Sequence, residues 1–128
     1  MIKTALKIST VALAAAISAP GAIAEEARKS EVAVFLTIET KPGQREALVD
    51  LWDKHLKDRA SEDRDHVNYV FALDMNDPNV IRIAEVYATQ AAFQTNTQSD
   101  WFAAYMAEAT KLLAGEPSFA MASPHWVK

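Results

Sequence analysis

Two strand-like segments that are apolar on both faces constrain the fold of this chain more than any other feature. Residues 80–87 (VIRIAEVY) and 32–38 (VAVFLTI) are rich in β-branched and aromatic side chains, and apolar residues occupy both alternating sets of positions in each. Strands of this kind lie inside a sheet, with another layer packed on each side. We therefore expect a sheet whose two faces are both covered.

Glu85 is the one acid in the segment 80–87. A buried carboxylate costs free energy unless it has a partner, so Glu85 is either paired or functional. In the structural alternative its partner is Arg82 or a backbone amide. In the functional alternative it binds a substrate.

A helix and a further strand are predicted between these two segments. The helix covers residues 44–59, where apolar side chains recur at helical spacing around Trp52. The strand covers residues 66–73, with Tyr69, Phe71 and Leu73 on one face. Residues 74–79 (DMNDPN) are dense in turn formers, which predicts an antiparallel hairpin with residues 80–87.

Two more helices and a last strand are predicted in the C-terminal part. Thr89 is placed to cap a short helix at 90–96, and Ser99 or Asp100 to cap a longer one at 101–114 that Gly115 ends. The last strand is predicted at 118–122. The stripe of the longer helix that we expect to be buried consists of Phe102, Tyr105, Met106, Ala109 and Leu113.

The predicted order is β-α-β-β-α-β, the ferredoxin-like α+β arrangement of a four-stranded antiparallel sheet with helices on one face. The helices leave the other face bare, although its side chains are apolar. A second copy of the sheet is the simplest cover, which predicts a homodimer. We expect Val34 and Val86 to point into that interface.

The N-terminal residues resemble a secretory signal peptide. Two lysines precede an apolar run of about ten residues, and Ala22, Ile23 and Ala24 form a small-x-small cleavage pattern. A retained membrane anchor is the alternative, but the run is shorter than the roughly 20 residues that span a bilayer. We expect a signal peptide at 1–24, a folded domain at 31–123, and a periplasmic or secreted protein.

Charge and composition exclude some classes of partner. The expected mature chain has 11 basic and 17 acidic residues, a net charge of −6, so a nucleic-acid partner is not expected. No membrane partner is expected once the signal peptide is removed. The chain contains no cysteine, so its core rather than a disulfide must stabilise it. We expect no cofactor and no metal, since the sequence has no glycine-rich phosphate loop and no HExxH motif.

The order and spacing of these segments resemble the antibiotic biosynthesis monooxygenase (ABM) family, the small dimeric α+β barrels that include quinol monooxygenases. The resemblance rests on residues 32–38 followed by Lys41-Pro42-Gly43 and an acidic amphipathic helix, and on DMNDPN followed by AEVYATQAAF. It implies oxidation of a quinol or phenolic aromatic by dioxygen without metal or flavin, in a pocket that binds, orients and desolvates the substrate. Haem-degrading relatives are expected to carry an Asn in the first strand, and residues 32–38 contain none.

The sequence departs from the family at one position. Many members carry a histidine shortly after the third strand, where this chain has Asn96. An amide can hold a substrate oxygen but does not accept a proton near neutral pH. Either another residue is the base, or the protein is a non-catalytic dimeric barrel that binds a small aromatic or hydrophobic ligand.

Seven residues are candidates for the site. The catalytic candidates are Asn96, His66 and His55, and the substrate-binding candidates are Tyr69, Trp101, Tyr105 and Glu85. Each has a structural alternative: a solvent-facing strand residue for His66, a hydrogen-bonded core residue for His55, and ordinary core packing for the aromatic residues. For Asn96 the alternative is a turn residue that bonds its own backbone.

Overall fold

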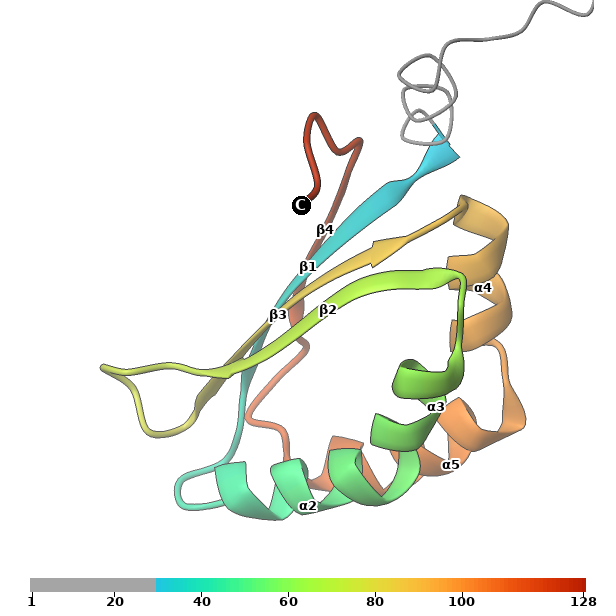
Figure 1. The fold of residues 1–128 in the computed structure, drawn as a ribbon. Coiled ribbons are helices and arrows are strands. Elements are labelled where there is room, and N and C mark those ends of the chain that lie inside the picture. Colours follow the sequence, from blue (N-terminus) through green and yellow to red (C-terminus); the bar gives the residue numbers. More distant parts are fainter. Residues whose placement is uncertain (1–29) are drawn as a thin grey trace, which may run out of the picture.

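The computed structural model describes residues 30–128, so the predicted signal peptide lies outside the described part of the chain. Within that part, four strands form one antiparallel sheet in the order β2-β3-β1-β4 (Figure 1). Their bounds are Val32–Glu39 for β1, His66–Leu73 for β2, Val80–Tyr87 for β3 and Ser118–Ala122 for β4. The two segments that are apolar on both faces, β1 and β3, are the central strands, as their composition predicts.

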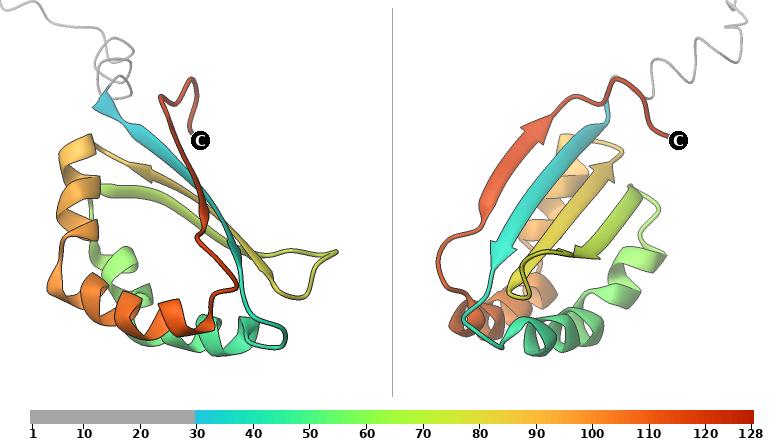
Figure 2. Two further views of the ribbon diagram at one scale, coloured as in Figure 1. Left: turned by 180° about the vertical axis from the view of Figure 1, so that it is seen from behind. Right: turned by 90° about the vertical axis from the view of Figure 1, so that its left-hand side faces the viewer.

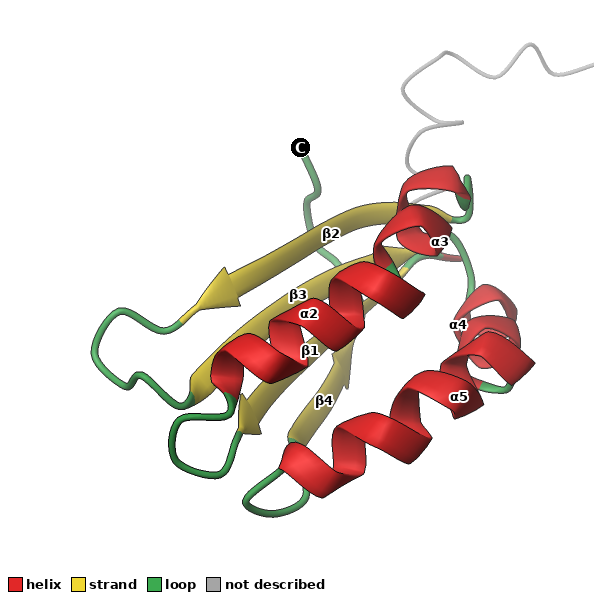
Figure 3. Ribbon diagram, turned by 90° about the horizontal axis from the view of Figure 1, so that it is seen from below, coloured by secondary structure: helices red, strands yellow, loops and turns green. Residues whose placement is uncertain are grey.

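Helices cover one face of the sheet (Figures 1 and 3). They are α2 (Arg45–His55), α3 (Lys57–Glu62), α4 (Gln90–Thr97) and α5 (Asp100–Ala109), and α5 continues as a 3-10 turn at Thr110–Leu112. This confirms the ferredoxin-like α+β prediction. No helix in residues 30–128 has the length and apolar character needed to cross a bilayer.

The predicted single helix at 44–59 is wrong, because the chain breaks at Leu56 into α2 and α3. Leu56 is buried, and its φ of −116° and ψ of −28° distort the backbone between the two helices although they stay in the right-handed helical region. The six residues of α3 include no buried side chain, so no apolar face holds them in line with α2. The change in direction brings the chain to the start of β2 (Figure 3).

The C-terminal helix also ends earlier than predicted. Thr89 caps α4 by accepting the Ala92 N–H at 3.0 Å, and Ser99 rather than Asp100 caps α5 by accepting the Phe102 N–H. Gly115 does not end the helix. Leu113 is already extended and forms a β-bridge with Thr40, which ties the end of α5 to the sheet.

The alternation of β1 gives the sheet one helix-facing side and one open side. Val34 is fully buried and shares the helix-facing side with Leu36 and Ile38, so the prediction that it points into a dimer interface is wrong. Phe35, between them, lies on the open side and is 49% exposed. Val86 of β3 also lies on the open side, as expected, and is partly exposed. No helix of the described residues covers this side of the sheet (Figure 2).

Candidate active site

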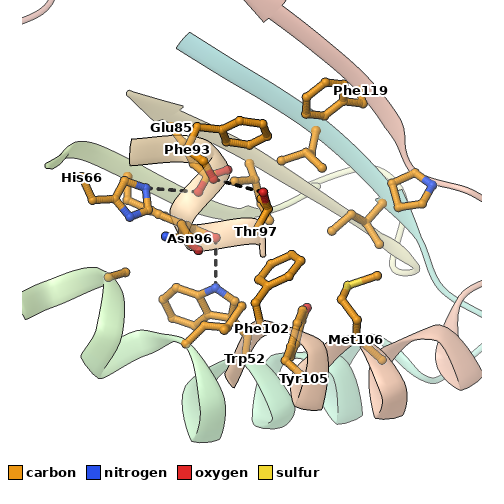
Figure 4. Close-up of a pocket in the computed structure, with 18 of the residues that line it drawn as sticks. Trp52, His66, Glu85, Phe93, Asn96, Thr97, Phe102, Tyr105, Met106 and Phe119 are labelled. Atoms are coloured by element: carbon orange, nitrogen blue, oxygen red, sulfur yellow. Dashed lines mark hydrogen bonds and ion pairs between the residues drawn. The ribbon is translucent and has the colours of Figure 1, made fainter. Parts of the chain in front are cut away.

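A cavity of about 240 Å³ lies between the helix-facing side of the sheet and the helices (Figure 4). Most of its wall is aliphatic or aromatic. Residues from all four strands and from α2, α3, α4 and α5 contribute to it. The aromatic residues of the wall are Trp52, Tyr69, Tyr87, Phe93, Trp101, Phe102, Tyr105 and Phe119. Such a wall favours an apolar, planar ligand.

The polar end of the cavity is formed by β2 and β3. The Nε2 atom of His66 lies 3.1 Å from Oε1 of Glu85, and the Tyr87 hydroxyl donates a hydrogen bond of 3.0 Å to the same oxygen. The side chains of His66 and Glu85 are only 1% and 9% exposed. Two ionisable groups are therefore enclosed together in an apolar wall.

A β-bulge gives His66 its orientation. Residues 66 and 69 are three apart and would point to opposite sides of a regular strand. The register shifts between His66 and Asn68, so that His66 lies opposite Tyr87 and Tyr69 lies opposite Glu85. The bulge thus brings His66 to the same side as Tyr69, which is a common use of a bulge near a site.

The imidazole of His66 is held mainly by ring contacts. Its ring stacks on Tyr87 with centroids 4.2 Å apart and an interplanar angle of 14°, and its edge meets Tyr69 at 4.8 Å. Neither ring nitrogen makes a well-aligned hydrogen bond with a residue in the described part of the chain, although Nε2 is at ion-pair distance from Glu85. A buried imidazole without aligned partners has its hydrogen-bonding capacity available for a ligand.

Tyr69 presents a hydroxyl donor at the same end. The Trp52 Nε1–H donates to the Tyr69 hydroxyl oxygen at 3.0 Å, which leaves the Tyr69 proton for another acceptor. Burial, and then the charge of Glu85, raise the pKa of Tyr69 well above its usual range. The same two causes raise the pKa of Tyr87. Both phenols are therefore protonated near neutral pH and act as donors.

The wall opposite the strands comes from α4 and α5. Asn96 and Thr97 reach the cavity from α4, and Trp101 and Tyr105 from α5. Burial raises the pKa of Tyr105 to about 12, so this phenol is also protonated. The guanidinium of Arg59 lies 5.5 Å from the centre of the Trp101 ring, a cation–π contact that fixes the ring from outside.

Comparison with known proteins identifies the family. The family model described as antibiotic biosynthesis monooxygenase matches residues 31–108. The chain belongs to the antibiotic biosynthesis monooxygenase family. No curated protein sequence matches the chain.

Solved structures share the ABM fold with this chain. A Nitrosomonas europaea protein of unknown function is 26% identical, with a TM-score of 0.66, and the match covers 79% of this chain and 95% of that one. A Chloroflexus aurantiacus protein assigned provisionally to the antibiotic biosynthesis monooxygenases is 23% identical, with a TM-score of 0.67 and coverage of 77% and 97%. The structure of Rv0793 from Mycobacterium tuberculosis is 22% identical, with a TM-score of 0.66 and coverage of 74% and 95%.

The ABM cavity of this chain brings together six of the seven site candidates: Asn96, His66, Tyr69, Trp101, Tyr105 and Glu85. His55 is the exception. It does not line the cavity, its Nε2 lies 3.8 Å from Oε1 of Glu108, and its ring meets the edge of Tyr105. His55 therefore supports the helix layer from outside the cavity.

The expected partner of Glu85 is wrong. Arg82 lies on the open side of β3, and its Nε donates a hydrogen bond of 2.6 Å to Oδ2 of Asp74. Glu85 and Arg82 are three residues apart in a regular strand, so they point to opposite sides of the sheet. His66 and Tyr87 contact Glu85 instead.

Three polar residues of the cavity wall, Tyr87, Trp52 and Thr97, are not among the seven site candidates. Tyr87 lies two positions after Glu85 in one strand, and that spacing alone places both side chains on the same face. Trp52 was assigned only to the apolar stripe of its helix. Its indole N–H gives it a second role as the donor to Tyr69.

Proposed function

We propose that this protein is an exported, cofactor-independent monooxygenase that oxidises a quinol or phenolic aromatic with dioxygen. The observation that carries the proposal is a cavity with a largely aromatic wall and a polar end, where a buried carboxylate and imidazole lie side by side. The apolar wall accommodates the ring, and the polar end accommodates its hydroxyl. ABM membership supports the reaction class.

The size of the cavity limits the substrate. At about 240 Å³ it falls just below the roughly 300–1,000 Å³ of typical small-molecule sites. A compact aromatic of one or two rings suits this volume better than a large polycyclic compound. The apolar wall also displaces water from around the bound ring, which favours reaction of an ionised substrate with dioxygen.

The proposed reaction needs only the substrate and dioxygen. A hydroxylated ring that has lost its proton donates electrons more readily than the neutral phenol. One oxygen atom is inserted at a ring C–H ortho or para to a hydroxyl, and oxidation to the quinone releases the second oxygen atom as water. One phenol and one dioxygen thus give one quinone and one water.

We propose further that the working form is a homodimer whose sheets pack together through their open sides. Phe35 of β1 and Val70 of β2 are 49% and 51% exposed on that side, next to the partly exposed Val86. An apolar sheet face of this kind favours a second apolar surface. No nucleic acid or membrane partner is part of this proposal.

Oxygen uptake by the purified mature protein tests the proposed function. A panel of benzoquinols, naphthols and other hydroxylated aromatics is presented, and uptake is compared with that of a protein-free control. The proposal expects enzyme-dependent uptake with at least one member and one dioxygen consumed per quinone formed. No uptake with any member would contradict it.

A non-catalytic barrel that binds a small aromatic or hydrophobic ligand is the second candidate. Asn96 favours it, because this amide occupies the cavity wall where many family members carry a histidine. This candidate expects saturable binding of panel members, measured by quenching of tryptophan fluorescence, without oxygen uptake above the control.

A further inference from the structure

We propose that Glu85 and His66 act together as the acceptor of the substrate's hydroxyl proton, and that the cavity selects hydroxylated aromatics bound with that hydroxyl at the β2–β3 end. The choice of an aromatic substrate rests on the proposed function. The assignment of the acceptor rests on the contacts around these two side chains.

The position of the open acceptor atom is the first argument. Oε1 of Glu85 is occupied by the Tyr87 hydroxyl and lies 3.1 Å from Nε2 of His66. Oε2 makes no hydrogen bond with a residue in the described part of the chain, and Glu85 lines the cavity. A substrate hydroxyl at this end therefore meets a carboxylate oxygen with free lone pairs.

The other polar groups around the pair provide the second argument. None of those that line this cavity can accept the substrate's proton in place of Glu85 and His66. Tyr69 and Tyr87 flank the pair on the strands, and Tyr105 faces it from α5; their raised pKa values keep all three phenols protonated. The Asn96 amide on α4 does not accept a proton near neutral pH. Asp63, after α3, lines a separate groove on the outside.

The proton transfer is balanced within the site. The substrate O–H bond breaks, its electron pair stays on oxygen as a phenolate, and the proton joins the pair at Oε2 of Glu85. Because the two side chains are in contact, the added proton belongs to the pair rather than to either residue. When dioxygen is reduced, this proton leaves in the water that forms. The Tyr87 hydroxyl is a positioning group that holds Oε1.

The test uses 4-nitrophenol as the probe, because the ionised form of nitrophenol absorbs at longer wavelength than the neutral form. The measurement is made in the absence of oxygen. Burial and the charge of Glu85 raise the pKa of phenols at this end, so a cavity without a proton acceptor would hold nitrophenol in its neutral form. The proposal expects the opposite, half-ionisation at a pH about one unit or more below that of free nitrophenol, because the released proton neutralises the Glu85–His66 pair in the same step. Glu85→Gln and His66→Gln should still bind it, but the bound probe should ionise at or above the pH of the free compound. Tyr87→Phe should show an intermediate shift.

Another histidine–carboxylate pair, His55 and Glu108 in the helix layer, supplies matched controls. His55→Gln and Glu108→Gln make the same chemical changes outside the cavity, and both should leave the spectrum and affinity of bound nitrophenol unchanged. The thermal unfolding midpoint of each variant is measured alongside, so that loss of folding is separated from loss of proton uptake.

Wild-type protein that binds nitrophenol in its neutral form, or that does not bind it, would overturn the proposal. So would a Glu85→Gln or His66→Gln variant, folded by thermal unfolding, that ionises the probe as the wild type does. This test is independent of turnover. If the probe ionises as expected but no aromatic supports oxygen uptake, the proton acceptor stands and the proposed monooxygenase activity fails.

Discussion

The His66 imidazole and the Glu85 carboxylate lie 3.1 Å apart, side by side on neighbouring strands and almost completely shielded from solvent. An isolated buried charge at either position is costly, because neither water nor a surface counter-ion reaches it. Together they form a polar site inside an otherwise apolar cavity. Retaining such a pair inside the core is easier to explain by chemistry than by stability, since apolar replacements often stabilise a fold.

Asn96→Ala tests whether the α4 amide holds a substrate oxygen. Loss of one hydrogen bond, about 1 kcal/mol, should lower kcat/KM with the best substrate of the panel by about fivefold to tenfold. The thermal unfolding midpoint should stay unchanged. Asn96→His, which restores the residue common in the family, should retain activity. A lower midpoint with unchanged kcat/KM would assign Asn96 a purely structural role.

The sequence predicted the sheet well because local patterns specify it. The bounds of β2, β3 and β4 agree with the prediction, since alternation, a strong hairpin turn and a capping Thr89 all point to the same elements. The break at Leu56 was missed because residues 57–59 continue a helix-compatible composition. Only the absence of buried side chains in α3 distinguishes the two segments, and that depends on packing.

The sequence predicted most of the candidate residues that line the cavity, but it did not predict which of them contact one another. Apolar and aromatic spacing placed Trp101, Tyr105 and Tyr69 toward one layer, and all three line the cavity. The contact between His66 and Glu85 depends on the bulge in β2, which no residue pattern in 66–68 indicates. His55 and His66 were equivalent from sequence alone, and only the structure separates them.

The hydrogen bond from Trp52 to Tyr69 should contribute measurably to stability. Trp52→Phe and Tyr69→Phe each remove one partner of a 3.0 Å bond in the cavity wall. A double-mutant cycle by urea unfolding should give a coupling free energy of about 1 kcal/mol. A coupling close to zero would mean that the two groups do not bond in solution.

The open side of the sheet should control assembly. Phe35→Asp or Val86→Asp places a carboxylate in the proposed interface, where burial is costly, and should convert dimers to monomers. Light scattering coupled to size-exclusion chromatography measures the mass. Ala104→Asp, at an exposed position of α5, is the control and should remain dimeric. Folded dimers of both strand variants would show that the open side is not the interface.

Asp74 should confer a pH dependence on stability at the hairpin. The hydrogen bond from Arg82, followed by the backbone N–H groups of Asp77 and Asn76, lowers the pKa of Asp74 from 3.8 to about 2. A carboxyl with a lowered folded pKa stabilises the fold above its unfolded pKa, and this contribution is lost as pH falls from 3.8 toward 2.

Urea unfolding across that pH range measures the effect. Asp74→Asn should show a shallower loss of stability on acidification than the wild type, and Asp50→Asn, which removes an exposed carboxyl of α2, should follow the wild-type curve. Identical curves for wild type and Asp74→Asn would contradict the role of the Arg82 contact.

Oxygen-isotope labelling tests the proposed monooxygenase activity most directly. The mature protein is supplied with ¹⁸O₂ and with the aromatic that gives the fastest oxygen uptake, and the product is examined by mass spectrometry. The account predicts a quinone that carries one ¹⁸O atom, with the second atom recovered in water. An unlabelled quinone formed together with labelled hydrogen peroxide, or no product above the protein-free control, would contradict it.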